Sequence, residues 1–418
     1  MTIRFYQIAG AATLALLSQP ALAAPGGPVA VGSGLTIDPI IDARLRYEAV
    51  NTPTLEADAA TLRLRAGAEL RHESGLAVLA EAESTLALVD DYNAFPFVIA
   101  SRQRRPQFAV VADPANVELN RLQVQYKTRG ATLTLGRQRI NVDDQRWIGN
   151  GAGWRQNEQT YDAVRGEGQV GPMTFDVAYS TSQRTGLGFD AGPRTAYDGR
   201  FTLLGAGTRL GPVNFKAFAY LLDYDAAEQA GALATTNADT QTYGARATAA
   251  FKLSPKITLN LAASYARQSD WQGNPARYGA DYLAGEAGLG FGSAGLTTGV
   301  EVLGSDNGHA VQTPMAALHK FNGWADLFLT TPAAGLQDWY AGASYRFAKV
   351  SALPGLNAAV TFHRFESDAG ALHYGDEWDA SLGFKLGRAN LLAKYADYNA
   401  ATFGADTRKV WLQLELAY

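Results

Sequence analysis

The chain contains no cysteine among its 418 residues, so disulfide-stapled scaffolds, thiolate zinc sites and cysteine nucleophiles are excluded. Charged residues make up only 18%, and the formal net charge is −4, so no basic footprint for nucleic acid is present. Histidine is rare, and none of the five stands in the His-Glu-x-x-His pattern of zinc peptidases. Because a Gly-x-Ser-x-Gly elbow is also missing, we expect no enzyme, no cofactor and no metal site.

After its first 24 residues the sequence lacks a long apolar run, whereas a membrane-spanning helix needs about 20 apolar residues. The N-terminus itself is typical of secretory signals: Arg4 precedes an apolar stretch from Ile8 to Leu17, and Ala21-Leu22-Ala23 is a small-x-small cleavage site. We therefore expect residues 1–23 to be a cleaved signal peptide, and residues 24–38 to form an N-terminal periplasmic segment.

The remaining chain is dominated by strict alternation of apolar and polar residues, the pattern of a β-strand with two different faces. Between Ile41 and Glu48 every second residue is charged, and in the segments 62–71 and 409–418 every second residue is again apolar. Roughly 18 such strands are predicted. They begin near Ile40, Thr61, Leu76, Glu118, Ala131, Gln159, Met173, Arg200, Asn214, Thr242, Ile257, Asp281, Leu296, Trp339, Leu356, Trp378, Leu391 and Lys409.

The connections between these strands alternate in length. Short ones carry turn residues, as in Val170-Gly171-Pro172, while long polar loops such as 90–117, 141–158 and 305–337 fall between them. A soluble sandwich is the alternative, but about 18 strands are too many for one sandwich, and no linker separates two. We therefore predict an all-β fold: a transmembrane antiparallel β-barrel over 39–418, with short periplasmic turns and long extracellular loops, in the outer membrane of a Gram-negative bacterium.

The end of the chain supports this prediction. Tyr418 closes the last alternating strand with an aromatic residue on its apolar face. Such an ending resembles the signal that bacterial outer-membrane proteins present to the barrel-assembly machinery. We therefore expect two partners for the barrel, the assembly machinery through Tyr418 and the lipid of the outer membrane.

The charged faces of the strands must line the lumen, because a charge facing lipid costs roughly 2–4 kcal/mol at mid-membrane. Arginine binds carboxylates through a planar fork of donors, so an arginine-rich lumen favours anions. The alternative is that these residues only brace the wall by pairing with lumen acids. The predicted pore-lining cations from the strands are Arg44, Arg46, Arg63, Arg65, Arg121, Arg246, Arg346 and Lys394.

Two longer motifs carry a family resemblance. Gly136–Gly149 continues into Gly153–Arg165, and His319–Asp326 runs on to Asp338-Trp339-Tyr340. Both stretches are rich in Trp, Asn and Gln, and they resemble the signature of the alginate-export family of outer-membrane porins. The resemblance implies an 18-stranded monomeric barrel whose positively charged constriction passes an anionic uronate polymer outward.

The resemblance also implies roles for single residues in the first motif. Positive charge near the pore would come from Arg137, Arg139, Arg146, Arg155 and Arg165, and the acidic lumen partners would be Asp143, Asp144, Glu158 and Asp162. From the residues alone, the facing of Arg137, Arg139 and Arg165 stays open, because each shares its parity with apolar neighbours. The motif could equally select the permeating anion or brace the wall.

These observations lead to one functional prediction and one alternative. The prediction is passive, anion-selective passage of an alginate-like polysaccharide through an arginine-lined pore. The alternative is a broader porin for the uptake of small organic acids or oligosaccharides.

Overall fold

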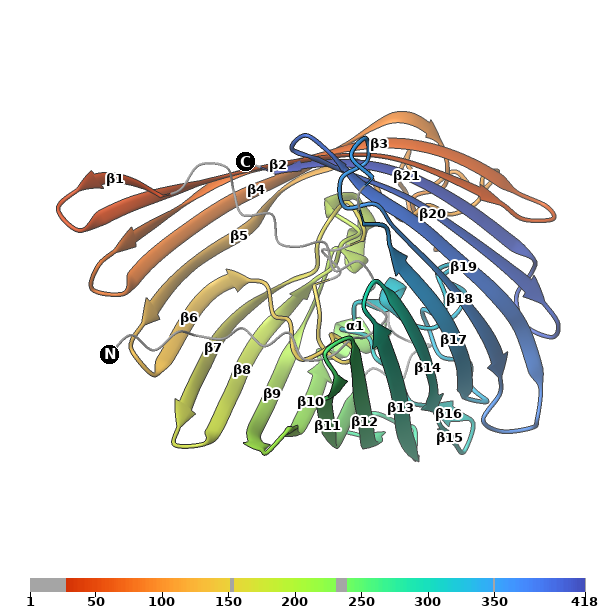
Figure 1. Cartoon of the computed structure of the whole chain (residues 1–418). Coiled ribbons are helices and arrows are strands. Elements are labelled where there is room, and N and C mark those ends of the chain that lie inside the picture. Colours follow the sequence, from red (N-terminus) through yellow and green to blue (C-terminus); the bar gives the residue numbers. More distant parts are fainter. Residues whose placement is uncertain (1–27, 151–153, 231–238, 349, 418) are drawn as a thin grey trace.

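The computed structural model describes residues 28–150, 154–230, 239–348 and 350–417, which form one antiparallel β-barrel (Figure 1). Within these residues eighteen strands make the wall, each hydrogen-bonded to its neighbours in the sequence. The first wall strand, β2 (Leu35–Asn51), pairs with the last, β21 (Thr407–Ala417), so the sheet closes on itself. The predicted barrel is confirmed, while the signal peptide and Tyr418 lie outside the described residues.

The other wall strands match the predicted segments one for one. Their bounds are β3 (Glu56–His72), β4 (Leu76–Asp91), β5 (Asn116–Lys127), β6 (Ala131–Gln138), β7 (Thr160–Val170), β8 (Met173–Arg184), β9 (Ala196–Leu210), β10 (Val213–Tyr224), β11 (Thr240–Ser254), β12 (Ile257–Asp270), β13 (Gly279–Phe291), β14 (Ala294–Leu303), β17 (Leu336–Arg346), β18 (Asn357–Glu366), β19 (His373–Leu386) and β20 (Ala389–Ala400).

A few short elements lie outside this wall. The strand β1 (Val29–Gly32) pairs with the start of β2, inside the stretch expected as a periplasmic segment. A small hairpin joins β15 (Ser305–Asp306) to β16 (His309–Ala310). The helical elements are η1 (Phe189–Arg194), α1 (Ala226–Ala230) and η2 (Leu318–Lys320). In the described parts of the chain, no helix has the length and apolar character needed to cross a membrane.

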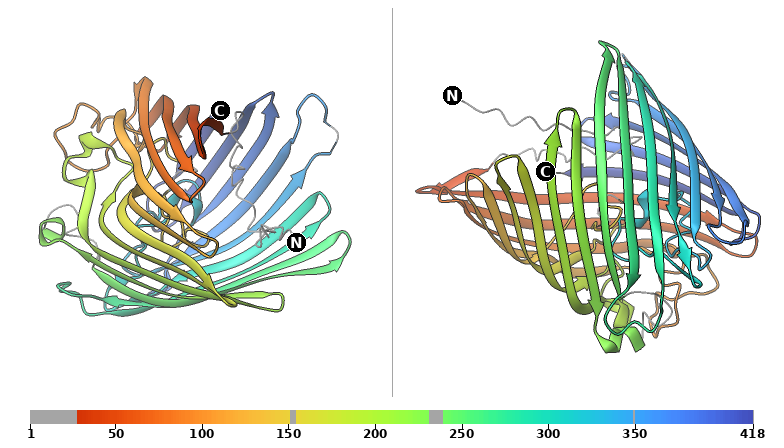
Figure 2. Two further views of the ribbon diagram at one scale, coloured as in Figure 1. Left: turned by 90° about the vertical axis from the view of Figure 1, so that its left-hand side faces the viewer. Right: turned by 90° about the horizontal axis from the view of Figure 1, so that it is seen from below.

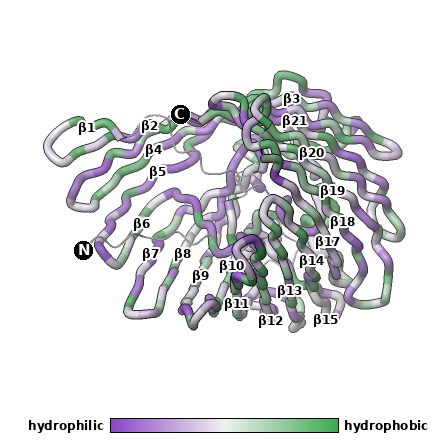
Figure 3. Tube along the Cα trace, viewed as in Figure 1, coloured by the Kyte–Doolittle hydropathy of each residue, from purple (hydrophilic) through white to green (hydrophobic). Residues whose placement is uncertain are grey.

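Hydrophilic and hydrophobic residues alternate along the strands (Figure 3), and their burial shows that they lie on two different faces of the wall. Leu45, Leu64 and Leu412 are exposed on the outside, whereas Arg44 and Arg63 on the same strands are buried inside the barrel. In lipid every backbone N–H and C=O must be paired internally, and a closed sheet achieves this without an edge. The apolar outer face and the polar lumen are therefore the arrangement expected of a barrel in a membrane.

The two rims of the barrel differ in their connections. At one rim the strands are joined by tight turns, several of which use a glycine with positive φ, such as Gly171 and Gly211. The connection between β17 and β18 is longer than the other turns of this rim. Figure 2 shows the strands tilted around the wall, with the longer loops gathered at the other rim. By the outer-membrane convention, the turn rim is periplasmic and the loop rim extracellular.

Candidate functional site: an arginine-lined constriction

Two loops that are far apart in the sequence fold into the lumen and touch each other. The first constriction loop (139–159) joins β6 to β7, and the second constriction loop (311–335) precedes β17. Their backbones are directly hydrogen-bonded: the N–H of Gly149 donates to the carbonyl of Met315 at 2.8 Å, and the N–H of Ala317 donates to that of Gln145 at 3.1 Å. These two loops carry the two motifs recognised in the sequence.

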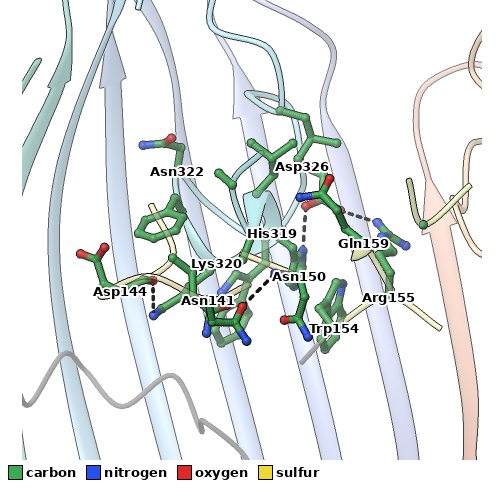
Figure 4. A pocket seen from close by; sticks show the side chains of 18 of the residues that line it. Asn141, Asp144, Asn150, Trp154, Arg155, Gln159, His319, Lys320, Asn322 and Asp326 are labelled. Atoms are coloured by element: carbon green, nitrogen blue, oxygen red, sulfur yellow. Dashed lines mark hydrogen bonds and ion pairs between the residues drawn. The ribbon is translucent and has the colours of Figure 1, made fainter. Parts of the chain in front are cut away.

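A buried carboxylate ties the two loops to each other and to the wall (Figure 4). Asp326, in the second loop, accepts a hydrogen bond from Arg155 of the first loop at 2.7 Å. It also lies 2.7 Å from Nδ1 of His319 and 3.2 Å from Nζ of Lys409 on β21. Burial opposes its ionisation, but His319, Lys409 and Arg155 together hold the pKa of Asp326 well below its usual range.

An aromatic cluster reinforces this junction. The ring of Trp154 stacks on His319 with centroids 4.0 Å apart. Nζ of Lys394, on β20, lies 3.8 Å from the ring centroid of Trp154 and 3.5 Å from that of Trp324. A cation held between indole faces and shielded from water gains substantially from their quadrupoles. Lys394 therefore fixes both loops to the wall, in addition to lining the cavity.

A tight turn in the second loop also depends on the wall. Gly323 has a φ of +82° and lies against β19, where Glu377 accepts a hydrogen bond from the N–H of Ala325 at 2.8 Å. A Cβ atom at position 323 would lie 2.4 Å from Oε2 of Glu377. The turn therefore requires glycine for both its backbone conformation and its space.

We expect Gly323→Ala to loosen the second constriction loop, at a cost of about 1–3 kcal/mol for the strained backbone alone. The measurement is the current noise of the open channel in planar bilayers, which should rise. Gly308→Ala in the β15–β16 hairpin is a matched control, because Gly308 also has a positive φ but faces open space. Equal noise in the two variants would contradict this role of the turn.

One wall of the lumen carries a row of arginines on three strands, β2, β3 and β5, and on the start of the first constriction loop. Every one of these arginines is paired with a carboxylate. Arg44 binds Glu415 at 2.7 Å, and Arg121 binds Glu81 at 2.6 Å. The arginine wall consists of Arg44, Arg63, Arg65, Arg121 and Arg139, and its carboxylate partners are Asp42, Glu81, Glu83, Glu158 and Glu415.

At the end of the arginine wall formed by Arg121 and Arg139, the paired carboxylates lie deeper than the cations. The side chains of Glu81 and Glu158 are 1% and 0% exposed, whereas those of Arg121 and Arg139 are 14% and 26% exposed. Burial alone would raise the pKa of Glu158, but Arg139 and Arg65 outweigh it and lower that pKa to about 2. Glu158 therefore stays ionised behind Arg139, and this part of the lumen exposes guanidinium groups more than carboxylates.

The opposite wall has a different chemistry. It presents carboxylates with tyrosines beside them: Tyr282 donates to Glu301 at 2.6 Å, and Tyr340 donates to Glu286 at 2.8 Å. The two walls and the two constriction loops enclose a cavity of about 980 Å³. A molecule inside it would meet guanidinium groups on one side and acidic and phenolic oxygens on the other.

Most predicted pore-lining residues meet in this cavity. Its lining includes Arg44, Arg63, Arg65, Arg121, Arg139, Asp144, Arg155, Arg246 and Lys394. The chain leaves the sheet after Gln138, which lets Arg139 turn inward despite its parity. Three other predicted residues are buried supports: Arg46 binds Asp113, Arg146 binds Glu301, and Glu158 lies behind the arginine wall.

The placement of Arg137 and Asp162 in the lumen was wrong. Arg137 lies opposite Leu122 on the neighbouring strand, which is exposed on the outside of the barrel. Asp162 lies opposite Arg137, and the two side chains pair at 2.8 Å. An outward charge can be tolerated here because the pair neutralises itself.

The remaining predicted residues lie away from this cavity. Arg165 does point inward, since its neighbour across the sheet is the buried Thr134, but it binds Asp176 rather than the first cavity. Arg346 is exposed at the last position of β17, at the periplasmic rim. Asp143 lies against a second, smaller cavity.

Sequence reasoning missed several residues of the site. Lys320, Trp324 and Lys409 were given no role, although the first two lie in the second motif. Tyr282 and Tyr340 were also missed, and only their alternation with outward residues could have indicated them. Among the described residues, no group of three or more His, Asp or Glu side chains is arranged to hold a metal ion.

Comparison with known proteins identifies the fold. No family model matches the sequence, and no curated protein matches it either. Solved structures do match over 91% of the chain: OccAB4 of Acinetobacter baumannii at a TM-score of 0.70 and 10% identity, covering 98% of that chain, and OpdO of Pseudomonas aeruginosa at 0.68 and 14%, covering 97%. A structure of P. aeruginosa OpdK with vanillate matches at 0.68 and 15% identity, covering 98% of that chain.

These neighbours are substrate-specific outer-membrane porins of the OprD/Occ group, with 18-stranded barrels. They overturn the resemblance to the alginate-export family, because they point to another family. The two motifs that suggested it lie in the two constriction loops, where their Trp, Asn and Gln residues contact the other loop or the barrel wall and do not indicate a polymer cargo. Together with the apolar outer face, the comparison confirms the predicted outer-membrane location, and the fold of the chain is that of these porins.

Proposed function

We propose that the protein is a passive outer-membrane channel for the uptake of small organic anions, with carboxylates as the preferred class. The single observation that carries this proposal is the arginine wall. The guanidinium groups of Arg121 and Arg139 are its most exposed cations and face the cavity, while their partners Glu81 and Glu158 are buried behind them. Such a surface lowers the electrostatic barrier for an anion, and the paired acids keep binding weak enough for release.

The size of the cavity supports small solutes. Its volume of about 980 Å³ lies at the upper end of the range of about 300–1,000 Å³ found for small-molecule sites. The two constriction loops meet across the lumen and are fixed to the wall by buried ion pairs. A narrow, braced passage of this kind favours a small acid over a polymer chain.

One structural neighbour supports the carboxylate class. The OpdK structure contains vanillate, an aromatic carboxylate. In the present chain the arginine wall would bind the carboxylate, while Tyr340 and Tyr282 on the other wall offer aromatic and hydroxyl contacts. We therefore expect aromatic monocarboxylates to be among the permeating solutes.

The test is electrophysiological. In planar bilayers under a potassium chloride gradient, the reversal potential should show preference for anions, and sodium benzoate should interrupt the current transiently. The double variant Arg121→Gln, Arg139→Gln removes the two most exposed guanidinium groups of the row and should reduce both effects several-fold. A control variant, Arg267→Gln, removes an exposed arginine from the outer face. A channel without anion preference and without block by benzoate would refute the proposal.

A further inference from the structure

A second cavity lies beside the first, on the periplasmic side of the first constriction loop. It has a volume of about 550 Å³ and is lined by the turn-proximal ends of β8 to β11, a part of the barrel distinct from the arginine wall. Its polar lining includes Thr174, Asn214 and Thr248 from the strands. Side-chain hydroxyl and amide groups of this kind can donate to the oxygens of a bound anion.

Two positively charged side chains of this cavity lie on neighbouring strands. Lys216 on β10 and Arg246 on β11 lie directly opposite each other, and two like charges in this position destabilise a sheet. Asp143 and Asp144 compensate, because Lys216 pairs with Asp143 at 3.1 Å and Arg246 pairs with Asp144 at 2.7 Å. The strand beside Lys216 also makes room for it, since a Cβ atom at Gly205 would lie 2.8 Å from its Cε.

A third cation joins this pair from the second constriction loop. Nζ of Lys320 donates to the backbone carbonyl of Asp144 at 2.7 Å (Figure 4). In the part of the chain that the structure describes, Lys320 forms no ion pair with a carboxylate. Glu286 on β13 is a further carboxylate within electrostatic reach of Lys320 and Arg246, and it accepts a hydrogen bond from Tyr340. Of the three cations, Lys320 is therefore the one that no ion pair among the described residues holds in place.

Lys320 also lies at the boundary between the two cavities. Lys320, Arg246 and Asp144 line both the first cavity and the second. They therefore stand where the two cavities adjoin, and an anion that leaves the arginine wall toward β8–β11 must pass them. Each arginine of the arginine wall is held in an ion pair, whereas Lys320 forms none with the described residues.

We propose that Lys320, Arg246 and Lys216 form a second anion-binding site, which receives a small carboxylate from the arginine wall and releases it toward the periplasm. The inference rests on the proposed function and deepens it, because the anion would then bind at two successive sites that lie on different strands. Two adjacent sites of moderate affinity let an anion pass from one to the other without fully regaining its hydration shell. The anion is therefore conducted and is not trapped at one site.

The experiment compares block of the channel by benzoate added to the extracellular and to the periplasmic side in planar bilayers. Lys320→Gln removes a charge without leaving a carboxylate unpaired, so the barrel should fold normally, as judged by heat-modifiable mobility in gel electrophoresis. Loss of one charged contact to the anion should weaken periplasmic-side block about tenfold. Block from the extracellular side should weaken less.

Two further variants and the wild type complete the test. Lys320→Arg keeps the positive charge, so periplasmic-side block should be as strong as in the wild type. If the lysine side chain were only structural, Lys320→Arg should weaken block as much as Lys320→Gln does. Lys256→Gln, at an exposed periplasmic turn, should behave as the wild type. If benzoate blocks the wild type and Lys320→Gln equally, the second site is refuted while the proposed function stands. If benzoate does not block the wild type from either side, the proposed function itself fails.

Discussion

Asp326→Ala should open the lumen. The substitution removes the carboxylate that Arg155, His319 and Lys409 share, and leaves two cations buried without this partner. Removing one member of a buried ion pair typically costs about 3–5 kcal/mol, because the remaining charge is desolvated and unpaired. The cost falls on the contacts between the loops and the wall, since the strands keep all their backbone hydrogen bonds. We therefore expect the constriction loops to detach within an intact barrel.

The measurement is single-channel conductance in planar bilayers, which should rise several-fold, together with loss of anion preference. The control is Asp281→Ala on the outer face, where Asp281 and Arg267 are 47% and 56% exposed and the pair contributes little. An unchanged conductance in a folded Asp326→Ala barrel would show that the loops are held by the aromatic cluster or by their backbone contacts, and not by this carboxylate.

The sequence predicts the wall of this barrel almost completely. Each strand has an apolar face, which lies against the membrane, and a polar face, which lines the lumen. Arg44 and Arg63 face inward as their parity requires. The parity of Arg137 with Leu133 and Leu135 left its facing open, and the structure places it on the outside, opposite Leu122. The family resemblance placed Arg137 in the lumen, which the register of β6 contradicts, whereas Arg165, whose facing was equally open, does point inward.

The interior of the lumen could be predicted only in part. A loop dense in Arg, Asp and Asn between two strands indicated the first constriction loop. Its partner loop is about 170 positions away, and nothing local shows that Arg155 meets Asp326 or that Lys394 lies between Trp154 and Trp324. The cargo was misjudged for the same reason: residues of the two motifs bind one another, whereas most of the arginine wall comes from strands outside both motifs.

Low pH should weaken the attachment of the constriction loops to the wall, because His319 contacts both Asp326 and Lys394. Its Nδ1 lies 2.7 Å from a carboxylate oxygen of Asp326, and its Nε2 lies 2.7 Å from Nζ of Lys394. A neutral ring satisfies both contacts, with Nδ1–H donating to Asp326 and the lone pair of Nε2 accepting from Lys394. A protonated ring would direct an N–H at the lysine and place two cations in contact.

The pKa of His319 reflects this arrangement. Burial lowers it first, and Lys394 and Arg155 lower it further, so that it lies well below its usual value although Asp326 acts in the opposite direction. The detached loop would titrate near the ordinary value of about 6.5. Below that pH the detached state binds a proton that the attached state excludes, so the free energy of attachment falls as the pH falls. Above it, both states are neutral and attachment does not depend on this group.

We therefore expect the frequency of large-conductance openings to be constant above about pH 6.5 and to rise steadily as the pH is lowered below it. The contribution of Asp326 to the free energy of loop attachment changes only at lower pH. A carboxylate with a depressed pKa loses its stabilising effect only as the pH falls below its ordinary pKa of about 3.9. In His319→Asn the rise between these two values should disappear, whereas His72→Asn at a periplasmic turn should leave it intact. If the rise persists in His319→Asn, another group controls the junction, and the neutral histidine contributes only through its stacking on Trp154.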